Sequence, residues 1–209
     1  MIVIVNPNST VAMTETLLAT AREAMPGARI EGWTSHDGPP AIQGPEDGAS
    51  CIPPLLRLVE KAEAAGARAV VIGCFDDTGL AEARALVACP VLGIGEAAYG
   101  QAAALGRFSV VTTLAVSVPV LEANIAALGL ASRCARVRAS GVPVLDLDTD
   151  PATAIPRVLA EARAAVAEDG IDAIVLGCAG MVHVAAAAPE FPVPLVDGLR
   201  AALELASDL

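Results

Sequence analysis

The chain has 209 residues, of which 55% are hydrophobic, 18% charged and 2% aromatic, and it carries a formal net charge of −11 at pH 7. This composition excludes a disordered chain and disfavours a nucleic-acid-binding protein, because no basic cluster offsets the negative charge that a phosphate backbone would meet. No apolar run approaches the ~20 residues of a membrane-spanning helix, and the start Met1-Ile2-Val3 lacks the basic leader of a signal peptide. We therefore expect a soluble, cytoplasmic protein whose five cysteines are free thiols.

Predicted strands and helices alternate along the whole chain. The first half contains, in order, strand Ile2–Val5, helix Val11–Ala24, strand Arg29–Trp33, helix Ser50–Ala65, strand Ala69–Ile72, helix Gly79–Ala88, strand Pro90–Ile94 and helix Glu96–Leu105. The second half repeats the order with strand Phe108–Thr112, helix Val118–Ala127, strand Arg133–Ser140, helix Ala152–Asp169, strand Ala173–Leu176, helix Val182–Ala188, strand Val193–Val196 and helix Asp197–Ala206. Strands that are apolar throughout and alternate with helices are typical of parallel sheets covered on both faces.

The polar segments between these elements predict caps and a loop. Ser9 or Thr10 is suited to cap the first helix, and Asp76, Asp77 or Thr78 the helix that begins at Gly79. The segment from His36 to Asp47 is rich in Gly and Pro and is predicted to be a loop that closes over the site.

A repeated segment indicates that the two halves are related. Gly66–Cys74 reads as a helix stop, a buried strand and then Gly-Cys, and Gly170–Cys178 has the same pattern. The predicted fold is therefore α/β, with two similar parallel-sheet lobes related by pseudo-two-fold symmetry and an active site in the cleft between them. We expect the first lobe to comprise residues 1–96 plus the closing helix at about 197–209, and the second lobe residues 97–196.

The repeat places two cysteines where ligands bind. Ligands of open α/β sheets bind outside the carboxyl ends of the strands, so Cys74 and Cys178 are expected to face each other across one substrate. Two such thiols can remove a proton from one face of a carbon and return one to the other face, because a thiol pKa of ~8.5 can be tuned toward neutrality. A helix N-terminus after Cys74 would favour its thiolate, whereas the charges of Asp76 and Asp77 would oppose it. The competing interpretation is that both cysteines are small buried hydrophobic residues.

Around these positions the chain resembles the hydantoin racemase branch of the Asp/Glu/hydantoin racemase superfamily. The motifs that carry the resemblance are Asn6-Pro7-Asn8-Ser9-Thr10, Gly73-Cys74-Phe75-Asp76-Asp77-Thr78-Gly79-Leu80, Gly93-Ile94-Gly95-Glu96-Ala97 and Gly177-Cys178-Ala179-Gly180-Met181. The resemblance implies cofactor-independent racemisation, a homo-oligomer, and Cys74 and Cys178 as the catalytic pair. It also implies substrate contacts from Asn8, Ser9, Thr112 and Thr113, and from the backbone of Phe75, Asp76, Ala179 and Gly180, which would hold the two ring carbonyls.

The resulting prediction is a racemase of 5-monosubstituted hydantoins, with a small-molecule substrate, no cofactor, no metal and no nucleic-acid or membrane partner. The alternatives are an allantoin racemase, a related isomerase or decarboxylase that uses one cysteine, and a non-enzymatic α/β module that binds a small ligand. Cys74, Cys178 and His183 could supply three metal ligands, but the Cys-x-x-Cys or His-x-x-x-His spacing of structural zinc sites is absent. Gly93-x-Gly95 lacks the rest of a nucleotide-binding fingerprint.

Overall fold

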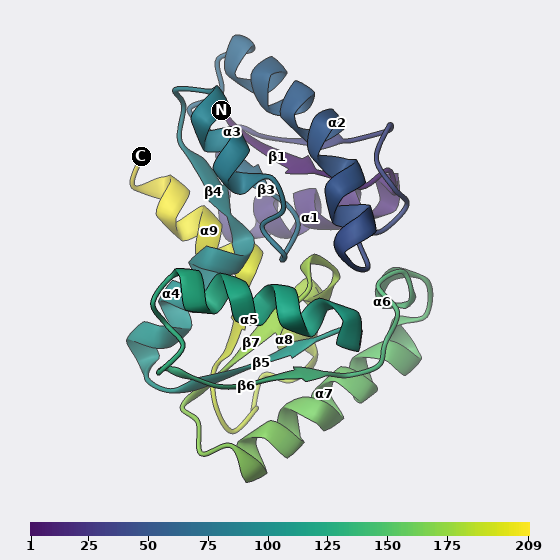
Figure 1. Cartoon of the computed structure of the whole chain (residues 1–209), viewed down its shortest axis with the longest axis vertical. Helices are drawn as coiled ribbons and strands as arrows, with labels where there is room; N and C mark the ends of the chain where they lie inside the picture. Colours follow the sequence, from purple (N-terminus) through teal and green to yellow (C-terminus); the bar gives the residue numbers. More distant parts are fainter.

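The computed structural model describes residues 1–209 and contains two lobes, each built on a four-stranded parallel sheet (Figure 1). The first sheet has the order β2-β1-β3-β4 and the second β6-β5-β7-β8, so the two halves share one topology. The strands are β1 (Ile2–Asn6), β2 (Ile30–Thr34), β3 (Ala69–Ile72), β4 (Val91–Gly93), β5 (Phe108–Thr112), β6 (Cys134–Ala139), β7 (Ala173–Gly177) and β8 (Leu195–Asp197). The predicted fold class is confirmed.

Helices connect consecutive strands and cover both faces of each sheet. The α-helices are α1 (Val11–Ala24), α2 (Pro45–Ala64), α3 (Leu80–Leu86), α4 (Ile94–Leu105), α5 (Val118–Ala127), α6 (Asp146–Thr149), α7 (Pro151–Glu168), α8 (Val184–Ala187) and α9 (Gly198–Ser207). Two short 3-10 helices are η1 (Ala115–Ser117) and η2 (Ala179–His183). No helix is both long enough and apolar enough to cross a membrane.

The core runs through both lobes. Every residue of the central strands β1, β3, β5 and β7 is buried, as expected for aliphatic strands covered on both faces. The largest hydrophobic cluster has 27 buried residues and includes Ile4 of β1, Tyr99 of α4 and Val110 of β5. One continuous apolar core therefore holds the two sheets in a fixed relation.

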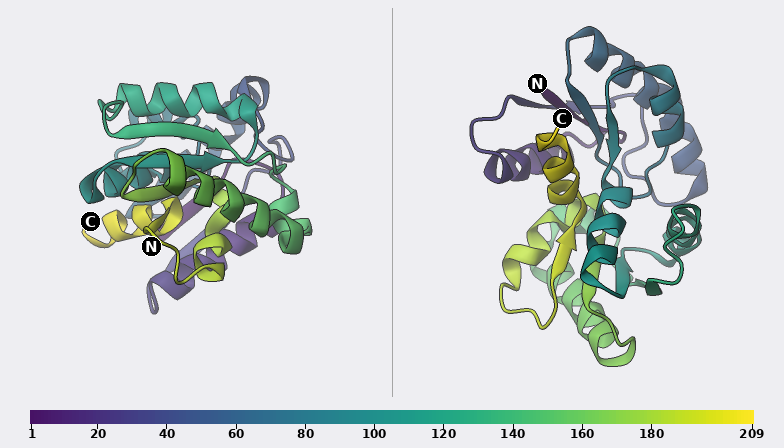
Figure 2. Two further views of the ribbon diagram at one scale, coloured as in Figure 1. Left: turned by 90° about the horizontal axis from the view of Figure 1, so that it is seen from below. Right: turned by 90° about the vertical axis from the view of Figure 1, so that its left-hand side faces the viewer.

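The last helix of each half packs on the other half's sheet. α4 follows β4 of the first sheet but packs against β7 and β8 of the second, whereas α9 follows β8 and packs against α1, β3 and β4 of the first. α4 and α9 also pack against each other, and Figure 2 shows α9 beside α1 at the chain's first lobe. On this packing we propose the division into residues 1–96 plus 197–209 and residues 97–196.

The predicted elements differ most from the structure at the start of α2 and after β7. α2 begins at Pro45, inside the predicted loop, because Pro45 occupies the first turn and Glu46 and Asp47 place acidic side chains at the helix N-terminus. The predicted helix Val182–Ala188 is instead the 3-10 helix η2 followed by the short α8.

The predicted caps are also wrong. Thr10 makes no side-chain cap to α1 and instead donates its hydroxyl to the carbonyl of Pro40 at 2.7 Å. α3 starts after Gly79, which has a left-handed φ of 78° and offers no side-chain cap. Asp77 lies in this turn, but its carboxylate caps α4.

Candidate active site

The two cysteines stand at equivalent strand ends and line one pocket. Cys74 follows β3 after Gly73, and Cys178 follows β7, which ends at Gly177. Both glycines are tightly packed, because a Cβ at either position would come within 2.8 Å of a neighbouring aliphatic side chain. The pocket encloses a cavity of about 30 Å³, which is room for one or two water molecules.

The structure brings eight of the ten predicted site residues into this pocket: Asn8, Cys74, Phe75, Asp76, Thr112, Thr113, Cys178 and Ala179. Ser9 and Gly180 do not line it. Ser9 donates its backbone N–H to Pro39 at 2.9 Å. Gly180 is buried against Leu147, where a Cβ would lie 3.0 Å from that side chain.

Burial favours the protonated form of both thiols. Burial raises the pKa of Cys74 well above its usual range and that of Cys178 to about 12, and the carboxylate of Asp76 raises both further. The backbone N–H groups of Asp76 and Gly180 act in the opposite direction on the Cys74 and Cys178 thiols respectively. The effect expected from a helix N-terminus, which would favour the Cys74 thiolate, is thus opposed by burial, which raises the pKa of this thiol.

Asp76 is the pocket's carboxylate. Burial raises its own pKa to about 6, and in its ionised form it can accept a hydrogen bond. No Lys, Arg or His side chain lines the pocket. A ligand with its own carboxylate would find no cationic partner here.

Hydrogen-bond donors come from both lobes. The side-chain oxygen of Asn8 accepts from the Asn6 amide at 2.9 Å and from the Thr10 backbone at 3.0 Å, which leaves its NH₂ group facing the sulfur of Met13 at 3.4 Å and the pocket. The Thr112 hydroxyl donates to the Gly177 carbonyl and so links the ends of β5 and β7. Two further pocket hydroxyls, Thr113 and Ser117, make no hydrogen bond within the chain.

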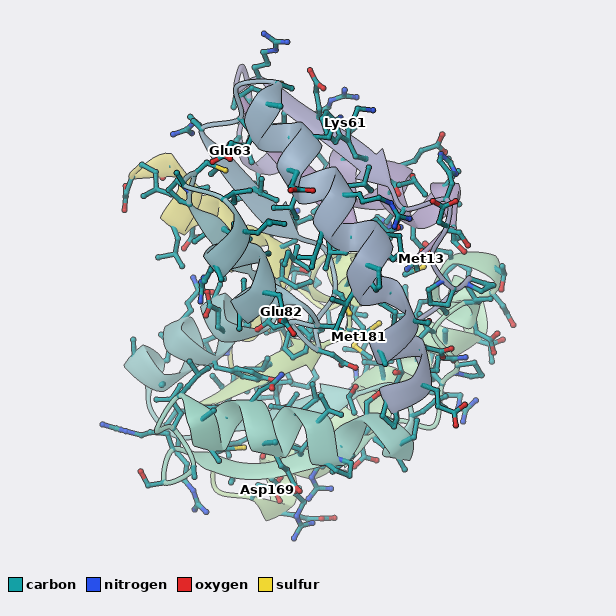
Figure 3. All side chains as sticks on the ribbon, turned by 45° about the horizontal axis from the view of Figure 1, so that its top comes forward. Met13, Lys61, Glu63, Glu82, Asp169 and Met181 are labelled. Atoms are coloured by element: carbon teal, nitrogen blue, oxygen red, sulfur yellow. The ribbon has the colours of Figure 1, made fainter.

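The sequence did not predict the apolar side of the pocket. We call Met13 of α1, Ile42 of the loop before α2 and Val144 of the loop before α6 the apolar wall. Their exposed fractions are only 4%, 8% and 5%, and Met13 and Val144 belong to a cluster that Cys178 packs against. Figure 3 shows Met13 at the junction between the lobes.

The loops that carry the wall meet over the pocket. The Gln43 side chain accepts a hydrogen bond from the Val144 backbone at 3.2 Å, and Ala41 packs against Met13 and Val144. Since these apolar residues come from separate segments with no common spacing, the only sequence signal was Ala41-Ile42 within a loop otherwise rich in Gly and Pro.

Other candidate groups lie outside the pocket. His183 is exposed and does not line it. No group of three His, Cys, Asp or Glu side chains is arranged to hold a metal ion. Cys51 is buried within α2, where it donates to the Gly48 carbonyl, and Cys134 lies on the edge strand β6.

Comparison with known proteins gives a consistent result. The sequence profile of the Asp/Glu/hydantoin racemase family matches residues 2–206. A hydantoin racemase of Rhizobium meliloti is 41% identical over 99% of the chain and 87% of its own length. Two solved structures cover 100% of the chain: an allantoin racemase from Klebsiella pneumoniae (86% of that chain, TM-score 0.96, 36% identity) and one from Pseudomonas fluorescens (89% of that chain, TM-score 0.92, 35% identity).

Proposed function

The chain belongs to the Asp/Glu/hydantoin racemase family, and from that premise we propose that it racemises 5-monosubstituted hydantoins without a cofactor. Cys74 and Cys178 are the acid/base pair of this proposal, one for each face of the ring. The observation that carries it is the presence of two thiols, from equivalent ends of two sheets, in one pocket without a cationic side chain.

The chemistry requires one thiolate and one thiol. The thiolate takes the C5 proton, and the electron pair of the broken C–H bond moves into the C4 carbonyl to give an enolate. The opposite thiol then donates its proton to the other face of C5, so the configuration inverts and the two cysteines exchange protonation states. A raised thiol pKa suits the acid role, and the base role requires the fraction of enzyme that has lost one thiol proton.

The polar groups of the pocket match a neutral ring. A hydantoin offers two carbonyl oxygens and two N–H groups. The Asn8 amide and the hydroxyls of Thr113 and Ser117 can donate to the carbonyl that becomes the enolate, and the Asp76 carboxylate can accept from a ring N–H. An aspartate or glutamate substrate would place its carboxylate beside Asp76 without an Arg or Lys to neutralise it.

The second candidate substrate is allantoin, which the likeness to two allantoin racemase structures favours. Allantoin carries a polar ureido group on C5. The apolar wall begins beside Cys178 and so beside C5, where a ureido group would be buried without hydrogen-bond partners at a cost of about 1–3 kcal/mol for each unpaired group. An alkyl substituent has no such cost, so we place 5-alkyl hydantoins first.

The test is the loss of ellipticity of enantiopure 5-isopropylhydantoin in deuterated buffer at neutral pH, corrected for the rate without enzyme. Enzyme-dependent decay with deuterium entering C5 is the expected result. Replacing either cysteine with Ser should abolish racemisation. Loss with only one of the two replacements would indicate a one-cysteine isomerase, and no catalysis by the wild type on hydantoins or allantoin would indicate a ligand-binding module.

The proposal also includes a cytoplasmic location, as the sequence predicts, and a homo-oligomer, as the family resemblance implies. Light scattering coupled to size-exclusion chromatography would give the subunit number, and a monomer would contradict this part.

A further inference from the structure

The segment after Cys74 is attached at consecutive residues to α4 and α5, two helices that pack on the second sheet. The Phe75 ring is buried and packs edge-to-face on Tyr99 of α4, with ring centroids 5.4 Å apart. The next residue, Asp76, accepts a hydrogen bond at its backbone carbonyl from the side-chain amide of Asn124 in α5, at 2.8 Å. Both helices pack on the second sheet, so each contact ties the first catalytic loop to the second lobe.

The third attachment is the strongest. The Asp77 carboxylate accepts from the backbone N–H groups of Gly95 at 3.0 Å and Glu96 at 2.6 Å, in the first turn of α4. Burial raises the pKa of Asp77 to about 7. In the ionised form of Asp77 these bonds are charge-assisted, and such bonds are about twice as strong as neutral ones. Asp77 is also the only residue other than glycine with a positive φ, at 51°, a conformation that Asp tolerates better than most residues.

The pseudo-symmetry of the fold shows that this cap is not the ordinary local one. In the second half, α9 is capped by Asp197, the last residue of β8, whose carboxylate accepts from the backbone N–H of Arg200 at 2.8 Å. β4 ends instead at Gly93, where any side chain would overlap the Asp77 carboxylate. Met181, which stands three residues after Cys178 as Asp77 does after Cys74, is buried and apolar.

The Cys178 loop is held by apolar packing, whereas the Cys74 loop is held by hydrogen bonds. The Cys178 loop continues directly into η2, which packs through Met181 into its own lobe's core and also packs against α1 of the first lobe. The Cys74 loop depends on hydrogen bonds to the first turn of α4 and to α5, helices that also pack on the second sheet. We infer that Asp77 and Asn124 are positioning residues that hold Cys74 in register with Cys178 across the substrate. The inference rests on the proposed two-cysteine reaction.

Loss of this register has a consequence that depends on the enantiomer. When the C5 proton faces Cys178, that thiolate still removes it, but a displaced Cys74 delivers its proton poorly to the other face. The Cys178 thiol, once its proton has exchanged with D₂O, returns deuterium to the same face, so exchange continues while inversion falls. For the other enantiomer Cys74 must act as base, and exchange and inversion fall together.

The experiment compares Asp77→Ala, Asp77→Asn and Asn124→Ala with the wild type. Deuterium incorporation at C5 is followed by NMR, and inversion by chiral chromatography, for each enantiomer of 5-isopropylhydantoin. Asn124→Ala should raise the exchange-to-inversion ratio for one enantiomer by about 2- to 12-fold, the equivalent of one hydrogen bond. Asp77→Ala should raise it at least as much, and Asp77→Asn less, because the amide oxygen keeps one acceptor. Glu82→Gln and Glu122→Ala, at exposed positions of α3 and α5, are matched controls and should leave the ratio unchanged.

Equal losses of exchange and inversion for both enantiomers, or an unchanged ratio, would overturn the inference. If Asp77→Ala does not fold, the Asn124→Ala variant tests the inference. The Asn124 side chain is half-buried on α5, so its replacement should leave the fold intact. If the wild type itself exchanges no deuterium at C5, the proposed function is overturned. This outcome is distinct from failure of the inference, because the wild type is measured before any variant.

Discussion

The apolar wall gives a quantitative prediction for substrate choice. The prediction is tested with the double variant Ile42→Ala/Val144→Ala. This variant truncates two of the three side chains that form the apolar wall. The quantity of interest is kcat/KM for 5-isopropylhydantoin relative to unsubstituted hydantoin. Both substrates need the same ring contacts and the same thiols, so the ratio isolates the contribution of the substituent.

The magnitude follows from the buried carbon atoms. An isopropyl group has three carbons, and burial at about 0.8 kcal/mol per carbon contributes about 2.4 kcal/mol, or about 60-fold in kcat/KM. Removal of two of the three wall side chains should take away about two thirds of this, which lowers the ratio about 15-fold.

The assay is C5 deuterium exchange by NMR, since hydantoin itself has no stereocentre. The matched control is Leu86→Ala/Leu128→Ala, which truncates two exposed hydrophobic residues outside the pocket and should leave the ratio unchanged. A ratio that stays within twofold of the wild type, or a wild type that turns over allantoin faster than 5-isopropylhydantoin, would refute the reasoning.

Three further predictions concern the pocket and its supports. In the proposed reaction the base is a thiolate, and burial raises the pKa of Cys178 to about 12 and that of Cys74 above its usual range. The value of kcat/KM, corrected for spontaneous racemisation, should therefore rise about tenfold per pH unit from pH 7 to 9. A plateau below pH 8 would show that a thiol titrates lower. Gly95→Ala should lower the free energy of unfolding by about 1–3 kcal/mol, because its Cβ would overlap the Phe75 carbonyl and lie 2.7 Å from the Asp77 carboxylate; urea denaturation showing no loss would contradict this packing. Because the loop before α2 places Ile42 at the pocket and its Gln43 side chain accepts from the Val144 backbone, bound substrate should slow proteolysis between His36 and Gly44. Equal cleavage rates with and without substrate would contradict a loop that closes over the site.

The sequence predicted the placement of the thiols because the signal is local. An aliphatic run that ends in Gly-Cys marks a strand end, and its recurrence fixed both positions in equivalent sheets. The fold class followed from the same alternation of strands and helices. The start of α2 was not predicted, because Gly44-Pro45 was interpreted as part of the loop. A proline in the first turn, followed by acidic residues, is equally typical of a helix start.

The apolar wall and the Asp77 cap could not be predicted, because each depends on contacts between distant segments. Met13, Ile42 and Val144 share no periodicity and meet only after both lobes have folded. Asp77 was expected to cap the helix that follows it directly. Its carboxylate reaches α4 instead, because Gly93 has no side chain to block it. The thiol pKa values likewise depend on burial, which no residue near Cys74 in the sequence reveals.

The exchange of α4 and α9 between the halves also constrains how the protein is made. The first sheet is complete in sequence at Gly93, but the helix that covers α1, β3 and β4 is α9, which ends at Ser207. During synthesis, domains of most proteins fold in order from the N-terminus. Here α9 can pack on the first lobe only after nearly the entire chain has left the ribosome. The part of the first lobe that α9 covers therefore lacks its covering helix until the last residues of the chain have been made.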